Sequence, residues 1–219
     1  MQYIYLNSDF FNKLSKDELG ALMQAVRISN GVLRRVKRVD AFGELDKNNF
    51  VQLFDMLDIH IEIAGYVRES WKVIYYDVCA LLSGMITKHC PAQLEQFTIN
   101  IRRYENYKKD INLSFVKYIR DEFGYHLGSG IYDDFYIDGI MLEDRKFGFI
   151  TGDNRPEITF IDPEIAIINK IRNHPLVCGD KFPITKAFNI ILEEAINLSG
   201  SIAKITRAIT EGHGYIKES

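Results

Sequence analysis

Arg120 and His126 are the residues whose types and spacing point most directly to chemistry. Arginine binds a phosphate through its rigid, permanently charged fork, and a histidine near its own pKa can accept or release a proton. Together the two side chains could cleave a phosphodiester without a metal ion. On an unbroken helix, six positions turn the chain by about 600°, which leaves the two side chains roughly 240° apart. Gly124 relaxes this constraint, because it lets the backbone leave helical geometry just before His126.

The same spacing occurs a second time, in Arg207 and His213, so spacing by itself is a weak indicator. A purely structural interpretation of the first pair stays open. Arg120 could pair with an acidic neighbour or with another helix, and His126 could act as a cation at the end of a helix.

Three predicted helical regions precede the candidate site. The first begins at the capping box Ser15–Glu18 and ends around Val39. The second runs from about 48 to 89, which exceeds the usual helix length, so we expect a kink near Gly65 or two helices in series. Pro91 suits the first turn of the third.

A shorter helix delivers Arg120 near its end. Asp110 or Asn112 could cap this helix, and its apolar spacing continues through Phe123. The polar Asp121 directly follows the arginine. The order of elements therefore places a helix end at the Arg–His segment.

After this segment, residues 147–151 and 157–161 flank a Gly/Asp/Asn/Pro turn and predict a β-hairpin. Further helices are predicted at about 162–171 and 185–211. The fold class is therefore mainly α. We expect an up-and-down helical bundle in one domain, 1–219, with a small β-hairpin (147–161) inserted before the C-terminal helices.

Composition limits the function further. The net charge of −3 and the pI near 6.0 argue against a protein that coats nucleic acid by bulk electrostatics, so an RNA substrate would need a local basic cleft. Cys79, Cys90 and Cys178 form no close pair, and we expect buried free thiols. No signal peptide or membrane-length apolar run is visible, which favours a cytoplasmic protein that does not enter the membrane.

The sequence shows no P-loop, no G-x-G-x-x-G, no H-E-x-x-H and no G-x-S-x-G. A di-metal carboxylate site in a helical bundle requires paired E-x-x-H motifs, and neither His60 nor His89 has a glutamate three residues before it. We therefore expect no metal and no cofactor.

The segment Arg120-Asp121-Glu122-Phe123-Gly124-Tyr125-His126-Leu127 resembles the signature of the HEPN superfamily (higher eukaryotes and prokaryotes nucleotide-binding domains). Members of this superfamily are helical bundles marked by R-x(4–6)-H, often with Asn, Asp or His directly after the arginine. The motif covers seven residues, and the order of helices extends the resemblance across most of the chain at the level of architecture. The segment is similar in character to members of the superfamily from abortive-infection and phage-defence systems.

This resemblance implies a metal-independent endoribonuclease of the toxin or phage-defence type, acting as a homodimer whose two motifs face one cleft. Arg120 would hold the scissile phosphate, His126 would be the general acid/base, and Asp121 would orient the pair or the RNA. Tyr125 and Tyr132 are candidates to stack on a base, although core packing is the more frequent use of such residues. Some toxin members carry a tyrosine two or three residues after the histidine, where this sequence has Gly128 and Ser129, so control by modification of that tyrosine is not supported.

Two other functions stay open from the sequence. The first is a non-catalytic helical module that binds a nucleotide or a partner protein, such as an antitoxin, in the same cleft. The second is an interaction protein that docks a partner on the exposed edge of the hairpin.

Overall fold

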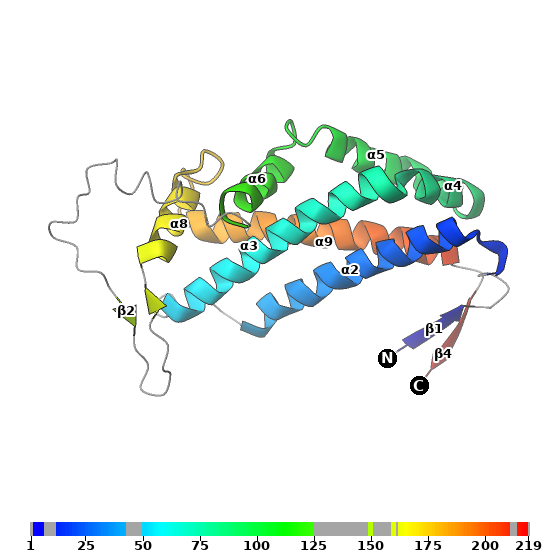
Figure 1. Cartoon of the computed structure of the whole chain (residues 1–219), viewed down its shortest axis with the longest axis horizontal. Helices are drawn as coiled ribbons and strands as arrows, with labels where there is room; N and C mark the ends of the chain where they lie inside the picture. Colours follow the sequence, from blue (N-terminus) through cyan, green and yellow to red (C-terminus); the bar gives the residue numbers. More distant parts are fainter. Residues whose placement is uncertain are drawn as a thin grey trace.

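The computed structural model describes residues 2–6, 12–42, 50–124, 149–150, 159–160, 162–210 and 214–218. In this part the chain is mainly α-helical, as the sequence predicts, and its long helices form an elongated bundle (Figure 1). No helix among these residues is both long and apolar enough to cross a membrane.

Helix α2 (Lys16–Phe42) begins at the predicted capping box. The backbone N–H of Ser15 donates to Glu18 Oε2 at 2.7 Å, and the N–H of Glu18 donates to Ser15 Oγ at 3.1 Å. These two bonds satisfy N–H groups that the first turn of a helix leaves without a partner. The helix continues three residues beyond its predicted end at Val39.

The long second helical region is interrupted, but not at Gly65. Helix α3 (Phe50–Val73) is followed by a π-helical turn, η1 (Ile74–Val78), and then by α4 (Cys79–His89). A π turn holds more residues than an α turn and so changes which side chains face the core. Here it buries Ile74 and Val78, while Tyr76 between them is exposed. The prediction of a kink near Gly65 is therefore wrong, and two helices in series is the correct alternative.

Pro91 opens a 3₁₀ turn, η2 (Pro91–Gln93), which leads into α5 (Leu94–Glu105). Asp110 caps the next helix, α6 (Ile111–Ile119), because its side chain accepts the N–H of Leu113 at 2.9 Å. The sequence left Asp110 and Asn112 open as caps, and the structure shows that Asp110 takes this role. Helix α6 then passes directly into a second π turn, η3 (Arg120–Gly124).

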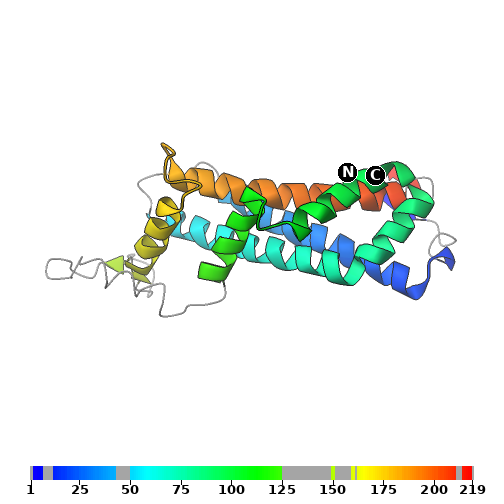
Figure 2. The same ribbon diagram turned by 90° about the horizontal axis from the view of Figure 1, so that it is seen from above.

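Helices α8 (Asp162–Asn173) and α9 (Pro183–Thr210) complete the described helices. Helices α2, α3 and α9 pack along one another, and α6 lies against α3 and α9 (Figures 1 and 2). Their apolar faces form one core, with Val32 from α2, Val67 from α3, Ile119 from α6 and Leu198 from α9 all buried. This core holds the end of α6, and therefore Arg120, against the side of α3.

Two short antiparallel pairings accompany the helices. Phe149–Ile150 (β2) pairs with Thr159–Phe160 (β3), so the strands that the sequence predicted for a hairpin meet in part; the turn between them, 151–158, lies outside the described residues. The other pairing joins the two ends of the chain: Gln2–Leu6 (β1) pairs with Gly214–Glu218 (β4) (Figure 1). No pattern in the sequence predicted this second pair.

The three cysteines are free thiols, as predicted. Cys79 and Cys90 are half-buried, and burial raises the pKa of both thiols. Cys178 is exposed, so the expectation of buried thiols is wrong for Cys178 and only partly met at Cys79 and Cys90.

At Gly31 of α2, the side chain of Tyr66 from α3 packs directly on the helix backbone. A Cβ built on Gly31 would lie 2.1 Å from the hydroxyl oxygen of Tyr66 and 2.5 Å from its Cζ. The Tyr66 ring is also held from its face by the guanidinium of Arg35, whose Cζ lies 3.9 Å from the ring centroid. A methyl group at Gly31 would therefore displace a ring that the guanidinium of Arg35 also contacts.

We expect Gly31→Ala to be destabilising relative to Gly20→Ala on the same helix. Nothing lies within 4 Å of a Cβ at Gly20, so both variants gain the helix propensity of alanine and only Gly31→Ala overpacks. The difference between their free energies of unfolding in urea should be about 1–3 kcal/mol. Equal free energies would contradict the close packing of Tyr66 on Gly31.

Candidate functional site

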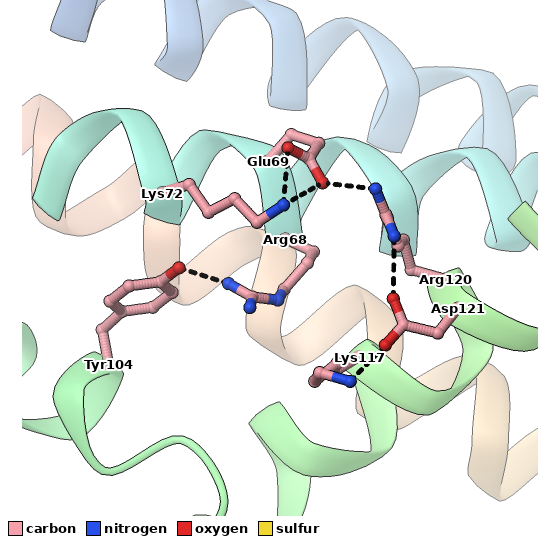
Figure 3. Close-up of polar contacts among 7 residues, drawn as sticks. All are labelled: Arg68, Glu69, Lys72, Tyr104, Lys117, Arg120 and Asp121. Atoms are coloured by element: carbon pink, nitrogen blue, oxygen red, sulfur yellow. Dashed lines mark hydrogen bonds and ion pairs between the residues drawn. The ribbon is translucent and has the colours of Figure 1, made fainter. Parts of the chain in front are cut away.

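Arg120 is the first residue of η3, where α6 leaves regular α geometry. The apolar residues of α6, among them Leu113, Val116 and Ile119, are buried in the core and fix the helix in place. Arg120 follows this buried face directly, and its side chain reaches α3 (Figure 3). Only 23% of that side chain is exposed, so the guanidinium is held and not free in solvent.

Two carboxylates hold the guanidinium of Arg120. Its Nη2 lies 2.9 Å from Glu69 Oε1 on α3, and its Nη1 lies 2.9 Å from Asp121 Oδ1. Each carboxylate also bonds a lysine: Lys72 Nζ lies 2.9 Å from Glu69 Oε1, and Lys117 Nζ contacts Asp121 Oδ2. The result is a continuous chain of alternating charges with Arg120 at its centre (Figure 3).

Arg68 lies beside this chain on α3 (Figure 3). Its Nη1 donates to the hydroxyl of Tyr104, and its Cζ lies 4.7 Å from the centroid of the Tyr107 ring. Cations over aromatic faces at such distances are attracted by the ring quadrupole. Tyr75 also contacts the Tyr104 ring, with centroids 5.4 Å apart, so aromatic rings border the charges on this side.

We call the six charged residues the basic cluster. It contains four cationic and two anionic side chains, so its net charge is +2 at pH 7 although the whole chain carries −3. Its members are Arg68, Glu69, Lys72, Lys117, Arg120 and Asp121. A local surplus of positive charge is what the sequence analysis required for a nucleic-acid site on an acidic protein.

The ionisation of the cluster is fixed by its own contacts. The hydrogen bond to Asp121 is the main reason that the pKa of Arg120 is raised, and the negative charge of Glu69 adds to it. Desolvation alone would raise the pKa of Asp121, but its hydrogen bonds to Lys117 and Arg120 outweigh this and lower it. At neutral pH the arginine is therefore charged and Asp121 is an acceptor only.

Of the predicted site residues, the structure brings Arg120 and Asp121 together. His126, Tyr125 and Tyr132 lie outside the described residues. Gly124, the last residue described in this segment, stays next to the arginine, because a Cβ built on Gly124 would lie 3.7 Å from Arg120 Cγ. The alternative that Arg120 pairs with an acidic neighbour and with another helix is also correct, since it does both.

Sequence reasoning missed Arg68, Lys72 and Lys117. Arg68 and Lys72 are four residues apart, and Lys117 and Arg120 are three apart, so each pair shares one face of its helix. This spacing was visible in the sequence. That the two faces meet is a fact of the packing between α3 and α6.

The second arginine of the same spacing, Arg207, has different surroundings. It lines a cavity of about 400 Å³ between α2 and α9, whose other lining residues carry no charge: Val26, Ser29, Asn30, Ala203, Thr206 and Thr210. His213 lies outside the described residues. The two Arg-x₅-His segments thus differ in their surroundings: charged side chains surround Arg120, whereas the other residues that line the cavity at Arg207 are uncharged. The sequence alone did not show this difference.

Within the described ranges, no group of three or more His, Cys, Asp and Glu side chains could hold a metal ion. The chain matches no protein-family model, no curated protein and no solved structure with which it was compared.

Proposed function

We propose that this chain is a metal-independent endoribonuclease in which Arg120 binds the scissile phosphate and His126 is the general acid/base. Asp121 orients Arg120. The observation that supports this proposal most is the basic cluster, which surrounds the arginine of the motif with three further cations.

Glu69 and Asp121 give the arginine a fixed orientation before any substrate binds. An arginine that is already ordered loses less side-chain entropy when it binds a phosphate. The carboxylates also reduce the attraction for a phosphate, and the lysines on either side offset this effect because each neutralises one carboxylate. A phosphate at Arg120 would therefore meet a fixed net positive charge, and its attraction to that charge strengthens as negative charge develops on the phosphate in the transition state.

The covalent chain limits how far His126 can lie from Gly124. Two residues cannot carry the backbone more than about 7 Å beyond Gly124, whatever their conformation. Since Gly124 is packed on the stem of Arg120, a proton-transfer role for His126 beside a phosphate bound at Arg120 is geometrically accessible.

The aromatic border of the cluster suits single-stranded RNA. Tyr107 lies next to Arg68, and Tyr76 is exposed beside Tyr75, whereas Tyr104 is only 5% exposed and serves as packing beneath them. Aromatic rings next to cations bind single strands by combining base stacking with phosphate contacts. Tyr125 and Tyr132 stay candidates for the same role.

The proposal includes the wider features that the HEPN resemblance implies. These are a homodimer with the two motifs facing one cleft, a role as a toxin or in phage defence, a possible antitoxin partner, and a cytoplasmic location. The up-and-down bundle with its inserted hairpin is part of the same resemblance.

We expect purified protein to cleave RNA in the presence of EDTA. Arg120→Ala and His126→Ala should each lower the cleavage rate at least about 100-fold, as the loss of one preorganised group at a developing negative charge does in other enzymes. The measurement is the cleavage rate of a labelled single-stranded RNA, with circular dichroism to show that each variant is folded.

Arg207→Ala is the matched control, because it removes the arginine of the second Arg-x₅-His segment, and its cleavage rate should equal that of the wild type. Undiminished cleavage by both site variants would contradict the proposal. RNA binding that depends on Arg120, without any cleavage by the wild type, would instead favour the non-catalytic binding module.

A further inference from the structure

A polar groove lies between α5 and the C-terminal half of α9, apart from the basic cluster. Its volume is about 680 Å³, which is within the range of small-molecule sites. None of its lining residues belongs to the basic cluster. They are Gln93, Gln96, Phe97, Asn100, Arg103, Asn197, Ser201, Lys204 and Ile205.

Hydrogen bonds between the two helices fix the order of these residues along the groove. Arg103 Nη2 donates to Glu194 Oε1 at 2.8 Å, and Asn100 Nδ2 donates to Ser201 Oγ at 3.0 Å. Moving backwards along α5 therefore means moving forwards along α9. Arg103 stands at one end of the groove and Lys204 at the other, and the seven helical steps from residue 197 to residue 204 correspond to about 10 Å.

The middle of the groove presents groups that can both donate and accept hydrogen bonds. Asn100 is half-buried and is ordered by Ser201, and Gln96 Nε2 lies 3.5 Å from Asn100 Oδ1. Below them, Phe97 and Ile205 are buried and form an apolar floor. Amides and hydroxyls over a small apolar floor fit a sugar, whose hydroxyls likewise donate and accept and whose C–H faces are apolar.

Arg103 and Lys204, the two cationic residues that line the groove, differ in how far nearby carboxylates compensate their charge. Arg103 is bonded to both Asp110 and Glu194. Lys204 is exposed, forms no ion pair with any described residue, and no Asp or Glu lines the groove. An anionic group in the groove is therefore attracted to the Lys204 end.

We propose that this groove binds a phosphorylated sugar, either free or as the ribose phosphate of a nucleotide. The phosphate lies at Lys204, and the sugar hydroxyls bond Asn100 and Ser201. This inference is independent of the ribonuclease proposal, because it uses none of the residues of the basic cluster.

Isothermal titration calorimetry of the whole chain tests it with four probes: ribose 5-phosphate, AMP, ribose and inorganic phosphate. We expect submillimolar binding of at least one phosphorylated sugar, with ribose and inorganic phosphate each at least about tenfold weaker. Similar affinities for ribose 5-phosphate and AMP would assign the site to the sugar phosphate itself. Tighter binding of AMP would assign it to a nucleotide.

Lys204→Met should weaken the binding of the phosphorylated sugar at least about tenfold, which corresponds to about 1.4 kcal/mol. Lys186→Met is the matched control, because it removes a lysine from the same helix outside the groove. Ser201→Ala should weaken the binding of the phosphorylated sugars but not the binding of inorganic phosphate. Three results would overturn the proposal. The first is that no phosphorylated sugar binds at millimolar concentration, and the second is that inorganic phosphate binds as tightly as ribose 5-phosphate. The third is that Lys204→Met leaves the binding unchanged.

Discussion

Replacing Arg103 with methionine is expected to reduce the free energy of unfolding by about 3–5 kcal/mol. Arg103 joins α5 to α6 and α9: its Nε lies 2.5 Å from Asp110 Oδ2, and its Nη2 lies 2.8 Å from Glu194 Oε1. The hydrogen bond to Asp110 is the main reason that the pKa of Arg103 is raised. Only 1% of the Glu194 side chain is exposed, so methionine would leave a buried carboxylate that still accepts a long hydrogen bond, 3.4 Å, from Asn112 Nδ2.

The double variant Arg103→Met/Glu194→Leu separates the lost ion pair from lost packing. Removing both partners takes away the uncompensated buried charge, so much of the stability should return. Arg102→Met is the matched control on the same helix, where the side chain is exposed, and it should change the free energy by no more than about 0.5 kcal/mol. Urea denaturation at pH 7 measures all three variants. A double variant no more stable than Arg103→Met would show that Glu194 does not depend on Arg103.

The second large effect is a loss of stability in acid that originates at His60. This side chain is 1% exposed, its Nδ1 lies 2.6 Å from the carbonyl oxygen of Met56, and its ring stacks on Phe188 with centroids 3.9 Å apart. Burial lowers the pKa of His60 to about 4, against a smaller opposing effect of the bond to Met56. The folded protein therefore keeps this imidazole neutral where an unfolded chain would protonate it.

The direction of this pH dependence follows from the pKa of His60 in the unfolded and in the folded chain. Above pH 6.5 the histidine is neutral in both states and has no effect on the pH dependence of folding. As the pH falls from 6.5 to about 4, the unfolded chain binds a proton that the folded chain does not, so the free energy of unfolding decreases. A shift of this size corresponds to about 3 kcal/mol in total.

His60→Leu should remove this part of the pH dependence. The measurement is the free energy of unfolding in urea at several pH values between 7.5 and 4, for the variant and the wild type. Their difference should change by about 3 kcal/mol across this range in favour of the variant. The pKa of His174 is also lowered by burial, but its effect is present in both proteins and cancels. Parallel pH profiles would contradict the prediction.

Local signals in the sequence were sufficient wherever the determining contacts are local. The capping box at Ser15 and the cap at Asp110 are closed by bonds to residues three positions away, so sequence spacing is enough to predict them. Pro91 at a helix start has the same explanation. The mainly α fold class follows from apolar periodicity within each helix.

Distant contacts were not predictable in the same way. The position of the π turn at Ile74–Val78 depends on which side chains the neighbouring helices accept, and Gly65 gave a misleading local signal. The pairing of β1 with β4 joins opposite ends of the chain, and its short strands carry no turn signal between them. The burial of His60 against Phe188 likewise depends on α3 meeting α9.

The candidate site divides in the same manner. By itself the sequence determined that an arginine and an aspartate follow a short helix and precede a glycine and a histidine, because residue types and local spacing are properties of the chain. Only the tertiary structure decided that Arg120 lies between Glu69 and Asp121 and that Arg68, Lys72 and Lys117 gather around it. The physical reason is that the core between α3, α6 and α9 sets which helix faces meet, and charges fifty residues apart act on one another only after this packing has brought them together.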